Sequence, residues 1–417
     1  MREAASALFK NRIYLYLLAV VFLMHLASYL VIPIFPIFLQ NTRLFSIGQV
    51  GIILGMSSIA YQGGSLLGGV LADRLGKRNV LIAGALTQGV GMVGYATSST
   101  YGLYLVFAAV NGLGIGLLAP TLKAMIADAV DADVRTKAFS WRGIIAHSGI
   151  IIAGLLVSWL AIARQRLFTI AAAFFLLLAT VALFGLPNDR CRGSECQSVS
   201  LVEYKQLLSH RSFLLFSAIT MLIWALYAQF GLVMPLRAGH VLETDKLVGL
   251  IWTFNSVSVV LLQGPISRFV LERINPYLSL VAGTFLLGLG LFCLGWADRF
   301  LTLCASSILF IVGEMLFMPV LDSLVGYFAR EELLGIYFGI SNFVSGIGAA
   351  VGTSIGGSMV ERLGGVASPA PWFVYGFVTI LFASMLGLFA IYAMARHRRG
   401  NPASPSPLIL ARKEKSK

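Results

Sequence analysis

Residues 69–81 read Gly-Val-Leu-Ala-Asp-Arg-Leu-Gly-Lys-Arg-Asn-Val-Leu, a short charged stretch between two long apolar runs. The runs cover 47–72 and 79–98, and a helix needs roughly 20 mostly apolar residues to cross the hydrocarbon core of a bilayer. Gly76 tolerates the positive φ that a tight turn between two helices requires. The stretch therefore predicts two membrane-spanning helices joined by a charged turn.

The same alternation of apolar runs and polar breaks continues along all 417 residues, of which 58% are hydrophobic and 12% charged. Soluble domains carry about a quarter charged residues, so lipid has to be the solvent for most of this chain. We predict an all-α polytopic membrane protein with twelve transmembrane helices. The predicted spans are 13–39, 47–72, 79–98, 102–129, 137–163, 166–187, 212–236, 246–270, 276–297, 300–328, 332–361 and 370–395.

A polar stretch in the middle of the chain divides these spans into two sets of six. Pro120 in span four and Pro319 in span ten stand 199 residues apart, and the Ser-Gly pairs at 148–149 and 345–346 in spans five and eleven are offset by 197. Near-equal offsets indicate a duplicated six-helix unit. We expect two pseudo-symmetric bundles at 1–187 and 212–399, a cytoplasmic linker at 188–211 and a disordered basic tail at 400–417.

The net charge of +13 could indicate nucleic-acid binding, but the basic residues gather at span ends and in the tail. With the N-terminus inside, internal segments hold 22 of the 31 Lys and Arg residues and external loops hold 7. This positive-inside bias predicts cytoplasmic termini and no nucleic-acid partner. The first apolar run is too long for a cleaved signal peptide. We expect a monomer in the plasma membrane, a bacterial inner membrane.

No residue cluster predicts a metal or cofactor. Cys191 and Cys196 have C-x4-C spacing in the polar linker, a weak metal pattern without further Cys or His ligands nearby. The chain has no P-loop, dinucleotide fingerprint or nucleophile elbow. We therefore expect no cofactor, no metal and no enzymatic activity, with a membrane-embedded enzyme or receptor as the alternative from a different class.

Residues 69–81 also resemble the G-x-L-a-D-r-x-G-r-k-x-x-l signature of the major facilitator superfamily, in the loop where that family carries it. The resemblance implies a secondary transporter that works by alternating access, and a charge relay that latches its halves in the outward-open state. Lys77 stands where arginine is usual and cannot make the same bidentate fork, so Arg74 or Arg78 could substitute; charges that serve only topology are the other interpretation. The gating candidates are Gly69, Asp73, Arg74, Gly76, Lys77, Arg78, Asp128 and Lys123.

Within that superfamily the chain is similar to the twelve-span drug:proton antiporters, and among them to the MdtH-type multidrug exporters. Residues 261–268, Leu-Leu-Gln-Gly-Pro-Ile-Ser-Arg, stand where a second copy of the loop motif would be. Two departures concern antiport. Ala108 occupies the place of an arginine in span four, and residues 149–154 of span five lack the proline of the antiporter signature.

Ionisable residues inside spans are rare and usually functional, because burying a charge in hydrocarbon costs at least about 2.5 kcal/mol. Glu314 lies near the middle of span ten, where desolvation suits reversible protonation; a structural hydrogen bond is the alternative. Asp322 could bridge to Lys123 across the inner gate, unless Lys123 snorkels to the interface. His25 and His147 titrate in a useful range and complete the proton-coupling candidates, with packing as the alternative.

An apolar, aromatic cavity with few polar groups suits lipophilic or cationic molecules better than sugars, which need many hydrogen bonds. We therefore predict proton-coupled efflux of drug-like, lipophilic or cationic small molecules. Export of a native metabolite or metallophore, or import, are alternatives on the same fold. The predicted cavity residues are Tyr29, Gln62, Asn111, Trp224, Gln229, Asn255 and Asn342.

Overall fold

The structure is a computed structural model that describes residues 9–131, 134–160, 164–187, 211–242, 244–271, 273–328 and 334–400. These ranges are helical and contain no strand, and twelve of their segments are long and apolar enough to cross a membrane. The predicted fold class and number of spans are thereby confirmed. The helices are α2 (Arg12–Val31), α3 (Phe35–Asn41), α4 (Ile47–Leu75), α5 (Lys77–Thr97), α6 (Tyr101–Asp128), α7 (Arg135–Leu160), α8 (Arg164–Gly185), α10 (Arg211–Val241), α11 (Asp245–Ile266), α12 (Pro276–Cys293), α13 (Phe300–Phe328), α14 (Leu334–Arg362) and α15 (Ala370–Gly400).

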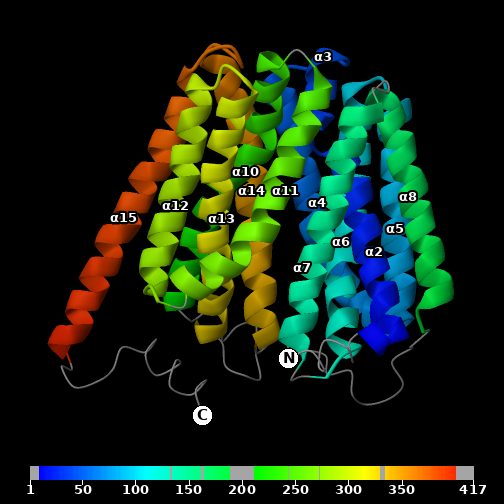
Figure 1. Cartoon of the computed structure of the whole chain (residues 1–417), viewed down its shortest axis with the longest axis horizontal. Coiled ribbons are helices and arrows are strands. Elements are labelled where there is room, and N and C mark those ends of the chain that lie inside the picture. The colour runs from blue at the N-terminus through cyan, green and yellow to red at the C-terminus, as the bar shows by residue number, and fades with distance from the viewer. Residues whose placement is uncertain are drawn as a thin grey trace.

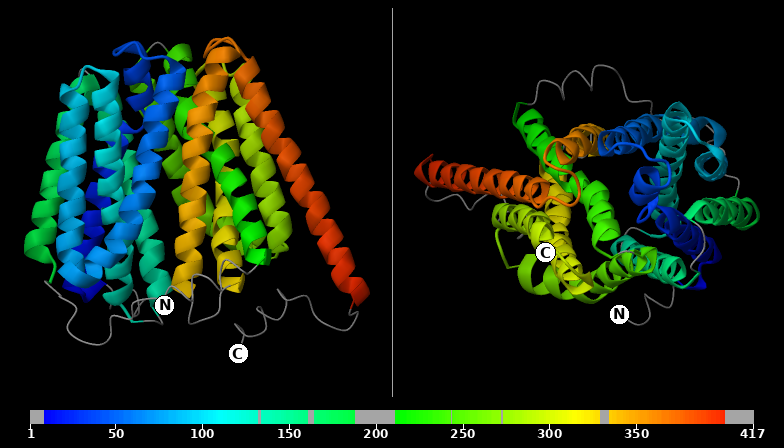
Figure 2. Two further views of the ribbon diagram at one scale, coloured as in Figure 1. Left: turned by 180° about the vertical axis from the view of Figure 1, so that it is seen from behind. Right: turned by 90° about the horizontal axis from the view of Figure 1, so that it is seen from above.

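The helices form two groups, α2–α8 and α10–α15, that stand side by side with their axes roughly parallel to one direction (Figures 1 and 2). We name the two ends of this assembly. The terminal face is the end where α2 begins and α15 ends, and the opposite face is the end where α4 begins and α14 ends. Residues 188–210 of the predicted linker and residues 401–417 of the predicted tail lie outside the described part of the structure.

Proline breaks the first span where the sequence analysis predicts a continuous helix. Pro33 stands in the turn between α2 and α3, and Pro36 in the first turn of α3. Proline lacks the N–H that an α-helix needs and its ring clashes with the preceding turn. A similar irregularity ends span eight, where the π-helical turn Ser267–Leu271 follows Pro265.

The stretch 69–81 is more helical than predicted. The helix α4 continues to Leu75 and α5 starts at Lys77, so Gly76 alone makes the connection, with φ +87°. This left-handed conformation is accessible to glycine at little cost and unfavourable for other residues. The turn therefore depends on Gly76.

Large apolar side chains cover much of the outer surface. Trp159 is 83% exposed and Phe184 is 82% exposed. Large exposed apolar patches are rare in soluble monomers. In a membrane these side chains face lipid, which agrees with the twelve spans.

The two helix groups meet mainly through two pairs of helices, α4 with α14 and α7 with α11, and through a smaller contact between α3 and α10. In the first pair, the backbone N–H of Gly48 donates to Glu361 Oε2 at 3.0 Å, and a Cβ on Gly51 would collide with the Thr353 carbonyl oxygen. These contacts lie in the opposite-face half of both helices, since α4 begins and α14 ends there.

The second pair meets in the same half of the molecule. Ser158 Oγ donates to the Lys246 carbonyl at 2.5 Å, and Thr253 Oγ1 donates to the Ile151 carbonyl at 3.2 Å. Gly154 and Gly249 approach each other so closely that a Cβ on either would lie 2.5–2.7 Å from the other's carbonyl oxygen. Both contacts between the groups are thus tight at the opposite face.

Candidate substrate site

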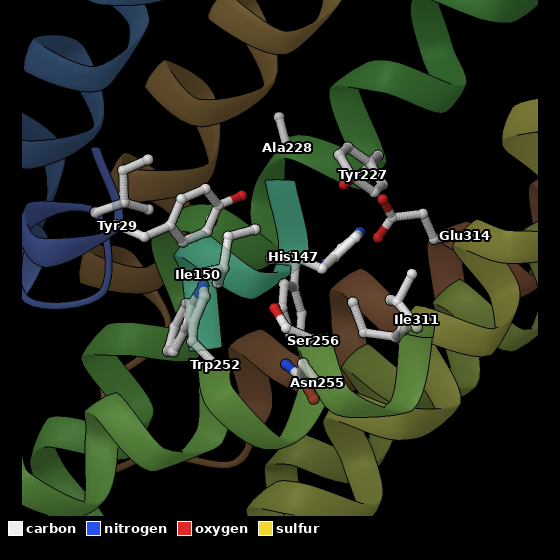
Figure 3. A pocket seen from close by; sticks show the side chains of 14 residues that line it. Tyr29, His147, Ile150, Tyr227, Ala228, Trp252, Asn255, Ser256, Ile311 and Glu314 are labelled. Carbon is white, nitrogen blue, oxygen red and sulfur yellow. The ribbon is translucent and has the colours of Figure 1, made fainter. Parts of the chain in front are cut away.

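A cavity of about 200 Å³ lies between the two helix groups and is lined by both. Its apolar and aromatic lining includes Ile32, Ile150, Trp252 and Ile311. Its polar lining consists of the side chains of Tyr29, His147, Tyr227, Asn255, Ser256 and Glu314, most of which Figure 3 shows around one space.

Five helices position these polar groups. Tyr29 stands on α2 just before the proline break, and His147 comes from α7 in the first helix group. Tyr227, Asn255 and Glu314 come from α10, α11 and α13 in the second group. A relative movement of the two groups would therefore change the cavity, because no single group encloses it.

Glu314 contributes the carboxylate of the cavity. The Tyr227 hydroxyl forms a side-chain hydrogen bond with it, and Tyr29 lies within its electrostatic range. Figure 3 shows the Tyr227 ring beside the carboxylate, while the rings of Tyr29 and Trp252 line another part of the cavity. A proton or an organic cation can neutralise a carboxylate in such surroundings.

His147 faces this pair across the cavity, and Figure 3 shows its ring extending toward Tyr227 and Glu314. Its Nδ1 is buried without a hydrogen-bond partner. His25 lies behind it on α2, where its Nδ1 contacts the Val21 carbonyl at 2.8 Å. Because a carbonyl only accepts hydrogen bonds, Nδ1 carries the proton there. Of the four predicted coupling residues, Glu314 and His147 therefore line the cavity and His25 lies next to His147.

Asp322 and Asp73 lie on α13 and α4, but their side chains are outside the described part of the structure, as is the Lys123–Asp322 bridge that the sequence analysis predicts. Lys123 itself is exposed on α6.

The remaining gating candidates gather at the terminal face. Lys77 forms an ion pair with Asp128, and Arg78 donates to the Leu186 carbonyl at 3.2 Å. Both contacts stay inside the first helix group. Arg74 and Gly69 are exposed on α4. The described part of the relay therefore does not join the two groups in this conformation.

The predicted cavity residues separate into three sets. Tyr29 and Asn255 line the cavity, while Trp224 and Asn342 line a second, small pocket of about 30 Å³. Gln62 is buried against Gly346 between α4 and α14, and Gln229 bonds to the Ala225 carbonyl of its own helix at 2.9 Å. Asn111 donates to Gln88 Oε1 at 3.1 Å, between α6 and α5.

Sequence reasoning missed Tyr227, Trp252 and Ser256. A signal for Tyr227 existed, because it follows Trp224 by three residues and so shares its helix face. Ala228 and Gly231 continue the same face and also line the cavity. On α11, Ser256 is next to Asn255 and Trp252 is one turn before it. Nothing in the sequence alone shows which side of α11 meets the first group.

The model of the Major Facilitator Superfamily matches residues 17–277 and 241–416. The chain belongs to the major facilitator superfamily. It is therefore a transporter and a multi-pass membrane protein, not an enzyme, and its likeness to MdtH-type proteins is confirmed at low identity. Multidrug resistance protein MdtH of Sodalis glossinidius is 26% identical over 363 residues, covering 87% of this chain and 89% of the relative. An uncharacterized MFS-type transporter, YqjV of Bacillus subtilis, is 24% identical over 371 residues, covering 87% and 88%.

Solved structures of the superfamily share the fold. The nucleoside transporter NupG superposes with a TM-score of 0.77 at 16% identity, over 90% of this chain and 98% of that one. A peptide transporter POT in complex with sulfate gives 0.75 at 15% identity, over 92% and 95%. At such identities the likeness concerns the major facilitator fold alone.

Proposed function

We propose that this transporter exports lipophilic organic cations in exchange for protons, and that Glu314 binds the proton and the cation alternately. The observation that carries the proposal is the position of Glu314. It is a carboxylate, hydrogen-bonded to Tyr227, in an aromatic cavity that both helix groups line. An aromatic lining attracts organic cations through the faces of its rings, and a carboxylate adds charge complementarity.

The shape of the assembly supports an inward-facing conformation. The contacts between the groups are tight at the opposite face, and the described Lys77–Asp128 pair at the terminal face stays within one group. The positive-inside bias of the sequence puts the terminal face on the cytoplasmic side of a bacterial inner membrane. A substrate would then enter from the cytoplasm and leave after the opposite-face contacts open.

Exchange at one carboxylate gives a defined cycle. A proton that arrives from outside neutralises Glu314 and releases the cation, and loss of that proton to the cytoplasm restores the charge for the next cation. A ligand that binds one conformation more tightly than the other shifts the population between them. The MdtH relatives carry a multidrug resistance name, which agrees with a cavity of this chemistry.

Everted membrane vesicles test the proposal. With the wild-type chain, acidification of the vesicle interior should drive accumulation of a fluorescent cation such as tetramethylrhodamine methyl ester, and collapse of the pH gradient should release it. Glu314→Gln should abolish gradient-driven accumulation, because the amide keeps the shape but cannot take up a proton. Wild-type accumulation without a pH gradient, together with full activity of Glu314→Gln, would contradict the proposal.

A further inference from the structure

The first helix group holds a basic side chain, Arg142, that the proposed exchange at Glu314 does not use. Arg142 on α7 is half-buried, and its Nε is buried without a hydrogen-bond partner. The ion pairs among the described side chains are Lys77–Asp128 and Arg299–Asp298, and neither involves Arg142. A guanidinium removed from water normally has an anionic partner, because burying an unpaired charge is costly.

Two histidines connect Arg142 to the cavity. His25 lies within electrostatic range of both Arg142 and His147. It is held there by close packing, since a Cβ on Gly149 would lie 3.3 Å from the His25 Cβ. His147 then reaches the cavity itself, where its buried Nδ1 has no partner in the described structure.

The second helix group presents the complementary charge. Glu314 lies on the other side of the same cavity from His147, on α13. The Tyr227 ring lies beside Glu314, and the rings of Tyr29 and Trp252 line the cavity farther from it. The site therefore combines two basic side chains with a buried unpartnered nitrogen, Arg142 and His147, with aromatic rings and a carboxylate.

We propose that Arg142 and His147 form an anion subsite, with His25 packed beside them, so that the transported molecules are zwitterionic aromatic compounds rather than simple cations. The carboxylate of the substrate binds the guanidinium and imidazole donors, and its amine or iminium group binds Glu314. This inference rests on the proposed function, because it assigns the second end of the molecule that Glu314 binds. Charge-assisted hydrogen bonds from Arg to a carboxylate are among the strongest in proteins and favour a planar anion.

Two dyes that differ by one group test the subsite. Tetramethylrhodamine has a free carboxylate, and its methyl ester lacks that negative charge but keeps the same aromatic cation. Fluorescence polarisation with the purified full-length protein in lipid nanodiscs gives a Kd for each. Because hydrogen bonds to charged groups are the stronger kind, the wild-type protein should bind the free acid about tenfold more tightly than the ester.

Substitutions then show which residues carry this preference. Arg142→Gln should reduce the ratio of the two Kd values to about one by weakening the free acid alone, and Arg142→Lys should retain part of it. Arg166→Gln is the matched control, because Arg166 is exposed on α8 outside the cavity and its loss should leave the ratio unchanged. If Arg142→Gln does not yield monodisperse protein, His147→Gln serves instead and should lower the ratio severalfold.

A wild-type ratio of one would overturn the anion subsite, as would an Arg142→Gln or His147→Gln variant that keeps the wild-type ratio or weakens both dyes equally. Glu314→Gln separates this outcome from the proposed function. It should weaken both dyes to the same extent and leave the ratio intact. If Glu314→Gln changed neither Kd while Arg142→Gln still removed the ratio, the role of Glu314 would fail and the anion subsite would stand.

Discussion

The opposite face and the terminal face of the molecule are built differently. At the opposite face, backbone meets backbone through Gly51 on α4 and through Gly154 and Gly249 on α7 and α11. At the terminal face, the charged pair Lys77–Asp128 lies inside the first group. The opposite face is a close-packed seam with few hydrogen bonds, and the terminal face holds charged side chains close to the helix ends.

The difference indicates what each end does in a cycle. Small residues let helices approach closely in a membrane, where no hydrophobic effect drives their association. Such a seam resists opening mainly through packing, so a modest free-energy input can separate it. Charged side chains at the terminal face can exchange partners instead. We expect added side-chain volume to disturb the opposite-face seam. The terminal-face pair should respond mainly to a change of charge.

The largest expected effect comes from adding one methyl group to the seam. In Gly51→Ala the new Cβ would collide with the Thr353 carbonyl oxygen, so α4 and α14 would have to separate. Overpacking of this kind costs about 1–3 kcal/mol, which shifts the population away from the opposite-face-closed conformation by about fivefold to 150-fold. Spin-label distances across the opposite face measure this shift, and dye export should fall in parallel.

Gly63→Ala on the same helix is the control for this variant. A Cβ at Gly63 meets nothing within 4 Å, and alanine is a better helix former than glycine by about 1 kcal/mol. This variant should keep wild-type distances and transport. Equal behaviour of the two variants would show that the seam does not carry the closure.

A smaller effect is expected from the hydrogen bond that joins the groups at the helix ends. Glu361 accepts from the Gly48 backbone N–H at the start of α4, where a negative charge also favours the helix dipole. Glu361→Ala should raise the free energy of the opposite-face-closed conformation by about 1 kcal/mol, which lowers its population severalfold. Glu361→Gln retains an acceptor and should lie between wild type and alanine in the same spin-label experiment. An alanine variant that closes as fully as wild type would show that Glu361 does not stabilise the closed opposite face.

The smallest effect is expected at the terminal face. The side chains of Lys77 and Asp128 are 37% and 58% exposed, and exposed ion pairs contribute about 0–1 kcal/mol. Asp128→Asn should therefore change the thermal midpoint of unfolding by only a few degrees, with Lys77→Met giving a similar result. A loss above about 2 kcal/mol from either variant would show that the pair stabilises far more than its exposure allows.

Much of the fold was accessible from the sequence, because hydrocarbon thickness dictates span length and polar breaks mark the turns. Gly76 was identified as a tight-turn residue, although the turn proved to be that single residue. Hydropathy predicts one continuous helix across Pro33 and Pro36, because it does not detect a missing backbone N–H. Pro265 was passed over for the same reason.

The site was only partly accessible. Glu314 and His147 stand out because ionisable residues are scarce in spans, and both line the cavity. Asn111 shows the limit of that reasoning, because its hydrogen bond to Gln88 is a contact between two helices of one group. Which face of a helix meets its neighbour depends on packing between segments far apart in the chain. The position of Gln62 at the seam beside Gly346 could not be predicted from the sequence for the same reason.

Proton release on substrate binding tests the central claim most directly. Purified protein in a weakly buffered solution with a pH indicator should release protons when tetramethylrhodamine methyl ester is added, because the cation displaces the proton from Glu314. The Glu314→Gln variant should bind the dye more weakly and release none at saturation. Equal proton release from wild type and Glu314→Gln at saturating dye, or no release from wild type between pH 6 and 8, would contradict the exchange of proton and cation at this carboxylate.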